Sequence, residues 1–169
     1  GGANPFMTEA AELQRPPDSN LDIRKEYAEL LIARDRLERR NRLERYKPYP
    51  KQLMFHSEGK DHRERLFMAA NQSGKTLAGA AEMAIHLTGK YPDWWEGRRF
   101  DTPILAIAGS ESTELTRDGV QNQLIGSPDD EGDWGTGFIP GDSIIGWARR
   151  LGVANALDTV TVKHSSGGK

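Results

Sequence analysis

Gly74, Lys75 and Thr76 are the residues whose types and spacing are best suited to binding phosphate groups. They lie in the stretch LFMAANQSGKTLAG (66–79), which matches the phosphate-binding pattern G-x-x-x-x-G-K-[ST] except at its first glycine. Glycine at 74 lets backbone N–H groups close on phosphate oxygens without a Cβ in the way. Lys75 supplies a mobile charge for the β- and γ-phosphates, and the Thr76 hydroxyl is a ligand for the Mg²⁺ that bridges them. We therefore predict that Lys75 and Thr76 act in catalysis, with Mg²⁺ on Thr76.

Ala69 stands where the pattern has its first glycine. That glycine mainly eases the departure of the chain from the preceding strand, and alanine can replace it where φ stays negative. The apolar run at 65–70 predicts a buried strand, and 75–88 predicts an amphipathic helix whose dipole favours an anion. This context is what the motif requires, the alternative being a chance Gly-Lys-Thr at a helix start. The predicted nucleotide-binding residues of the loop are Ala69, Ala70, Asn71, Gln72, Ser73, Gly74, Lys75 and Thr76.

The elements around this loop predict an α/β fold. The apolar segment 102–110 is expected to be a second buried strand, and 112–126 a second helix. Strand, glycine-bearing turn, helix, strand and helix follow one another in the order typical of a parallel sheet. The predicted fold class is therefore a P-loop NTPase with a parallel sheet flanked by helices.

Four other segments have recognisable patterns. Residues 20–46 contain no Gly or Pro and predict one long helix with a narrow apolar stripe and a basic second half. Two interpretations of that helix stay open. It is either a solvated helix with ion pairs between residues four positions apart, or a helix that docks on a partner or contacts nucleic acid. Residues 51–59 and 140–152 predict short helices, and 158–164 alternates like a half-exposed strand.

The domain organisation follows from these boundaries. Residues 1–6 precede Met7 and are expected to be a tag remnant. A flexible tail is expected over 7–19, then the long helix 20–46. Residues 47–169 are expected to form the N-terminal part of a P-loop ATPase domain.

Composition bounds the class of protein. The chain has 169 residues, of which 36% are apolar and 28% charged, and this suits one soluble domain with a charged extension. Absence of cysteine excludes disulfides and thiolate metal sites. No apolar run approaches the ~18 residues of a membrane span. Because the net charge is −2, any contact with nucleic acid must come from a local basic patch.

With these residues assembled, the chain resembles the large terminase subunit of tailed bacteriophages, particularly of podophages. MAANQSGKT (68–76) is similar to the variant P-loop of that family, and YPKQLMF (49–55) to its adenine-recognition motif. The segments AAEMAIHLTGKYPDWWEGRRF (80–100), IPGDSIIGW (139–147) and VKH (162–164) also resemble the family. The resemblance runs from about Tyr46 to the end of the chain.

The resemblance implies a RecA-like ATPase domain that binds ATP and Mg²⁺, with Gln52 reading the base. It implies that ATP hydrolysis drives double-stranded DNA into the procapsid, and that a nuclease domain follows. The implied partners are double-stranded DNA, the portal ring, the small terminase subunit and sister motor subunits in a homo-oligomer. The implied location is the host bacterial cytoplasm, transiently on the viral procapsid, with no membrane contact.

Two departures from the family pattern limit these implications. An apolar strand ending in Asp-Glu is needed to hold the Mg²⁺ shell and activate the attacking water. Neither candidate qualifies, because Glu111 is reached only after Gly-Ser and Asp158 is followed by Thr159. We therefore expect an N-terminal fragment that hydrolyses ATP poorly or not at all by itself. Where many terminases have a basic residue in the loop, this chain has Asn71. The arginine finger stays open among Arg98, Arg99, Arg117, Arg149 and Arg150.

Two rival functions remain open at this point. The first is another P-loop enzyme, a helicase or a small-molecule kinase. The second is a non-catalytic docking module that uses the long helix. The carboxylates of SPDDEGDWGTG (127–137) are expected to be solvated surface rather than a nuclease centre, and the four histidines lack metal-ligand spacing.

Overall fold

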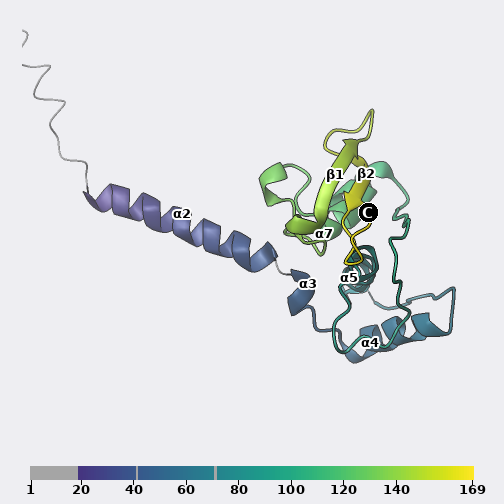
Figure 1. Ribbon diagram of the computed structural model, residues 1–169. Coiled ribbons are helices and arrows are strands. Elements are labelled where there is room, and N and C mark those ends of the chain that lie inside the picture. The colour runs from purple at the N-terminus through teal and green to yellow at the C-terminus, as the bar shows by residue number, and fades with distance from the viewer. Residues whose placement is uncertain (1–18, 41, 71) are drawn as a thin grey trace, which may run out of the picture. The chain divides into compact units, whose positions relative to one another are not determined.

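A computed structural model describes residues 19–40, 42–70 and 72–169 (Figure 1). The expected tag remnant and nearly all of the expected tail, together with Asn71 of the loop, lie outside the described residues. The chain divides into two units, residues 1–37 and 38–169.

The described part of the first unit is helical. The helix α2 spans Ser19–Arg40, and its apolar residues are exposed, Leu30 by 62% and Leu37 by 63%. The short helix α3, Arg42–Arg45, follows in the second unit. The described residues of the predicted helix 20–46 are helical up to Arg45, in two helices, α2 and α3.

The second unit holds short elements around one longer helix. In Figure 1, α5 lies between α4 and the two strands. The elements are α4 Pro50–Ser57, η1 Glu58–Lys60, α5 Lys75–Thr88, α6 Thr113–Leu115, the π-helical η2 Thr116–Gln121, α7 Asn122–Leu124, η3 Glu131–Asp133, η4 Gly141–Ser143, β1 Ile144–Arg149 and β2 Leu157–Val162.

The helix α5 supplies much of the core. Its bounds are those predicted, and left-handed glycines flank it at both ends, Gly74 and Gly89. Its alanine-rich face is buried and packs in one cluster with Phe138 and Ile139. Small side chains on this face let the neighbouring segments approach the helix closely. The helix therefore fixes the position of its own N-terminus within the unit.

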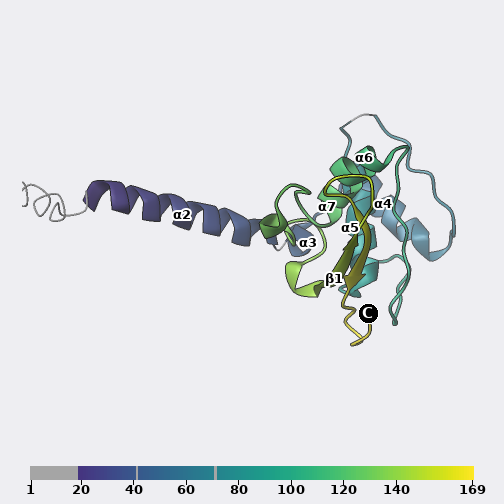
Figure 2. The same ribbon diagram turned by 90° about the horizontal axis from the view of Figure 1, so that it is seen from above.

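The predicted strands at 65–70 and 102–110 are not strands in the structure, and both are drawn without arrows in Figure 2. Their side chains alternate in exposure as in a strand, and Leu66, Met68, Leu105 and Ile107 are each at least 80% exposed. Neither segment pairs with another strand in the part of the chain that the structure describes. The apolar pattern predicted strands, but a strand also needs a neighbouring strand for its backbone hydrogen bonds.

The predicted helix at 140–152 is wrong. Residues Gly141–Ser143 form one 3-10 turn, and β1 follows, paired antiparallel with β2. The pairing satisfies the backbone groups of both strands, and Trp147 packs edge-on against Trp134 with ring centroids 4.9 Å apart. The predicted strand at 158–164 is confirmed as β2, and the predicted helix at 112–126 as the run from α6 to α7.

The observed fold is therefore a mixed arrangement of helices with one two-stranded antiparallel sheet. The predicted RecA-like parallel sheet is absent from the described residues. Of the helices in these residues, none has the length and apolar character to cross a membrane.

Candidate functional site

The loop before α5 contains two residues with left-handed backbone. Gln72 and Gly74 both adopt left-handed conformations, with φ of 60° and 78°. The loop leads directly into the 14-residue helix α5, whose first-turn amides have no acceptor within the helix. First-turn amides without a helical acceptor, at the positive end of the helix dipole, suit a phosphate group.

Lys75 lies over this loop. Its Nζ atom donates hydrogen bonds to the carbonyl oxygens of Ala69 and Ala70, the second at 2.9 Å. No carboxylate among the described residues lies within ion-pair distance of this ammonium group. Lys75 therefore carries a charge that an anion in the loop can engage without breaking an ion pair.

The hydroxyl-bearing residues of the loop face solvent. Ser73 and Thr76 are exposed, and Thr76 is the second residue of α5. An exposed hydroxyl beside a phosphate cradle suits Mg²⁺, which keeps several water ligands. Ser73 and Thr76 are therefore residues that could contribute a hydroxyl to a metal ion at this loop.

Gln52 lies on α4 and reaches the same loop. Its side chain is 1% exposed, and its Nε2 donates to the Gly74 carbonyl oxygen at 3.1 Å. Its Oε1 accepts from the Tyr49 backbone N–H at 2.9 Å and from the Tyr46 hydroxyl at 3.4 Å. The structure therefore brings Gln52 together with the predicted phosphate loop.

A buried polar network, which sequence reasoning missed, adjoins this contact. The carboxylate of Glu82, on α5, lies 2.7 Å from Nδ1 of His56 on α4. It also accepts two hydrogen bonds from the guanidinium of Arg65. The Tyr46 hydroxyl lies 3.0 Å from Nε2 of His56, so the network continues to Gln52.

The electrostatics of the network favour an ionised Glu82. Burial raises the pKa of Glu82, but hydrogen bonds with His56, His86 and Arg65, and the charge of Arg65, bring it well below its usual value. Burial, and then the charge of Glu82, raise the pKa of Tyr46 to about 12, so its hydroxyl stays protonated at neutral pH. One feature of the sequence could have indicated this network. Glu82 lies among the apolar residues of α5, and a carboxylate buried there needs hydrogen-bond partners.

Comparison with known proteins identifies the chain. Residues 66–168 match the family described as terminase large subunit, T4likevirus-type, N-terminal. The large terminase subunit of Salmonella phage P22 is 36% identical over 151 residues, which cover 82% of this chain and 30% of that protein. This chain belongs to the terminase large subunit family. It spans about a third of the length of this relative, and no solved structure matches it.

Four of the five arginines considered as fingers in this terminase chain have side-chain contacts with other residues, and the fifth, Arg150, lines the groove beside β2. Arg99 donates to the Trp95 carbonyl, and Arg98 lies over the Phe100 ring. Arg117 bonds to Asp118, and Arg149 to Glu131. The finger remains unassigned.

The carboxylates considered as a nuclease centre also have surface contacts in this terminase chain. Asp129 accepts a hydrogen bond from Asn155, and Glu131 pairs with Arg149. Oδ1 of Asp130 accepts from the Gly132 backbone N–H. These three carboxylates thus bond to three different residues.

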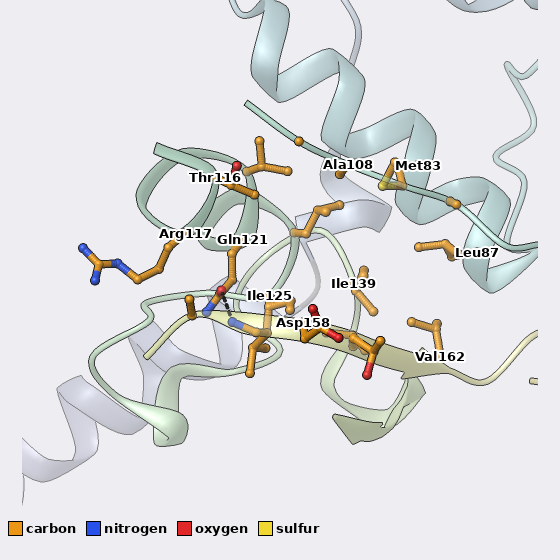
Figure 3. A pocket seen from close by; sticks show the side chains of 18 of the residues that line it. Met83, Leu87, Ala108, Thr116, Arg117, Gln121, Ile125, Ile139, Asp158 and Val162 are labelled. Carbon is orange, nitrogen blue, oxygen red and sulfur yellow. Dashed lines mark hydrogen bonds between the residues drawn. The ribbon is translucent and has the colours of Figure 1, made fainter. Parts of the chain in front are cut away.

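A separate groove of about 950 Å³ lies between residues 103–113, α5 and β2 of the terminase chain (Figure 3). Met83 and Leu87 line it from α5, and Val162 from β2. None of the described residues of the loop 69–76 lines it. The groove thus lies between the segment 102–110 and β2.

Proposed function

We propose that residues 69–76 of this terminase chain bind ATP with Mg²⁺. The observation that carries the proposal is the left-handed loop at the start of α5, with the Lys75 ammonium held over its carbonyl groups. Backbone amides of the loop would hold the phosphates, and Lys75 would neutralise their charge. Thr76 would hold Mg²⁺, which supplies charge stabilisation to the transferred phosphoryl group. That Gln52 reads the adenine edge stays a prediction from resemblance.

The proposed role of the whole protein is that of a DNA-packaging motor. Hydrolysis of ATP would drive double-stranded DNA into the procapsid, together with the portal ring, the small terminase subunit and sister motor subunits. Such a motor must contact the phosphate backbone, because a translocating machine cannot prefer one sequence. Family membership supports this role, and it also motivates the nuclease activity and the location in the host cytoplasm that we propose for the complete protein.

We also propose that segments 65–70 and 102–110 are strands of a RecA-like parallel sheet in the complete ATPase domain. Their alternating exposure has the period of a strand, and both carry apolar side chains on the exposed positions. The first segment leads into the phosphate loop, which is where a P-loop strand must end. Backbone hydrogen exchange in the complete protein would test this, since paired strands protect their amides.

The test of the nucleotide site is Lys75→Ala. The substitution removes the charge that faces the phosphates, so we expect it to abolish binding of Mg-ATP in calorimetry. Lys90→Ala is the control, because the Lys90 ammonium lies in a surface ion pair with Asp142 at 3.7 Å. Unchanged affinity of the Lys75 variant would refute the site.

A docking module is the second candidate, favoured by the exposed apolar residues of α2, among them Ile23, Leu30 and Leu37 at seven-residue spacing. Thermal melting with Mg-ATP separates the two functions. A ligand at ~100 times its dissociation constant stabilises a binding protein by ~2.7 kcal/mol. Absence of any shift would favour docking.

A further inference from the structure

The amide of Gln52 lies inside the protein. It is 1% exposed, and both of its ends bond to the protein: Nε2 to the Gly74 carbonyl, and Oε1 to the Tyr49 N–H and the Tyr46 hydroxyl. Its three contacts join α4 and the segment before it to the phosphate loop. In this arrangement the amide is bonded to the loop and buried from solvent.

Gly74 is the residue at which the loop becomes helix. Its carbonyl oxygen accepts from the Ala78 N–H at 2.9 Å, the first helical bond of α5, and from Gln52 Nε2 at 3.1 Å. A Cβ at Gly74 would lie 2.7 Å from Gln52 Nε2, and φ there is 78°. The Gln52 amide therefore occupies the space that a side chain at position 74 would need.

The helix α4 is also fixed to the body of α5. His56, one turn after Gln52, bonds to Glu82, two turns after Gly74. Arg65 bonds to both the Phe55 carbonyl and the Glu82 carboxylate, and its guanidinium lies 4.5 Å from the centre of the Phe55 ring. Contacts at Glu82 thus hold α4 against α5 and place Gln52 beside Gly74.

We propose that Gln52 is a positioning residue that sets the phosphate loop through the Gly74 carbonyl. This inference rests on the proposed nucleotide site and deepens it. It predicts that Gln52 contributes to binding of any ligand with a polyphosphate chain, whatever base the ligand carries. Base recognition by Gln52 predicts the opposite, an effect confined to ligands that carry adenine.

The test compares Gln52→Met with Gln121→Met in the full chain. Gln121 is an apt control, because its buried amide also bonds two backbone groups, the Asn155 carbonyl and the Leu157 N–H. Dissociation constants are measured for Mg-ATP, Mg-GTP and Mg-tripolyphosphate. We expect Gln52→Met to weaken all three by the same factor, about tenfold for one lost buried hydrogen bond, and Gln121→Met to change none. Loss for ATP alone, or no loss, overturns the proposal.

A second measurement does not depend on ligand. Without the Gln52 bond, the first turn of α5 should open more often, so hydrogen exchange at Ala78 and Gly79 should speed up in Gln52→Met and not in Gln121→Met. Unchanged exchange at these amides overturns the positioning role. If the wild-type chain binds neither nucleotide nor tripolyphosphate, the proposed function fails, and exchange alone decides the role of Gln52.

Discussion

At the scale of single residues, the carboxylate of Glu82 joins three segments of the chain. It bonds to His56 on α4 and to Arg65 before the loop, and its side chain is 10% exposed. Removing one partner of a buried ion pair leaves the other charge uncompensated. We expect Glu82→Gln to lower the free energy of unfolding by about 3 kcal/mol, measured by urea denaturation.

Glu131→Gln is the matched control for this prediction. Its carboxylate pairs with Arg149, but both side chains are about half exposed. Surface pairs contribute at most about 1 kcal/mol, so this variant should stay close to wild type. Equal losses in the two variants would contradict the role given to the network.

The pH dependence follows from the same residue. Because bonding lowers the folded-state pKa of Glu82 below its ordinary 4.5, its stabilisation is fully present above that value and is lost as pH falls below it. The difference in unfolding free energy between wild type and Glu82→Gln should therefore become smaller as the pH is lowered from 5. Denaturation curves over this interval check it, and a constant difference would refute it.

Single residues were predictable only where the signal was local. The loop residues lie in one short motif, and the structure places those it describes around one left-handed turn. The Glu82 network was missed because its members lie up to 36 positions apart in the sequence. The sequence around Glu82 does not indicate which distant side chains bond to its carboxylate. Their contact depends on how α4 folds back on α5.

At the scale of elements, α5 was predictable because both of its ends have local signals. Gly89 closes the helix with φ of 66°, and its N–H bonds to the Ile85 carbonyl at 2.9 Å. The strand β1 was missed because its pairing with β2 decides its conformation, and that partner follows only after a turn. Local sequence patterns determine the helix ends here, whereas pairing with a partner strand determines the strand.

Two glycines in and beside α5 give a paired prediction. A Cβ at Gly79 meets nothing within 4 Å, so Gly79→Ala should raise the unfolding free energy by about 1 kcal/mol through helix propensity. A Cβ at Gly89 would lie 2.4 Å from His164 Nε2 and in a left-handed conformation, so Gly89→Ala should destabilise by at least about 1 kcal/mol. Thermal melting of both variants measures this. A stabilising Gly89→Ala would contradict the observed helix end.

At the scale of the whole molecule, the folded unit has extended segments that expose apolar side chains. Leu105 is 93% exposed and Ile107 88%, although their sequence reads as buried strand. The sequence pattern therefore describes a more complete sheet than these residues form, which is why the fold class was predicted only in part. Exposed apolar segments with unpaired backbone groups favour association between chains.

The double variant Leu105→Lys/Ile107→Lys tests this view. Because both side chains are exposed in this chain, the change should alter the unfolding free energy by no more than about 0.5 kcal/mol for each site. It should also reduce concentration-dependent association in sedimentation, since two like charges oppose edge-to-edge pairing. Leu124→Lys is the contrasting control, because Leu124 is 8% exposed in the core and should lose stability. If the double variant loses as much stability as Leu124→Lys, the segment is already paired in solution, and its exposed state is refuted.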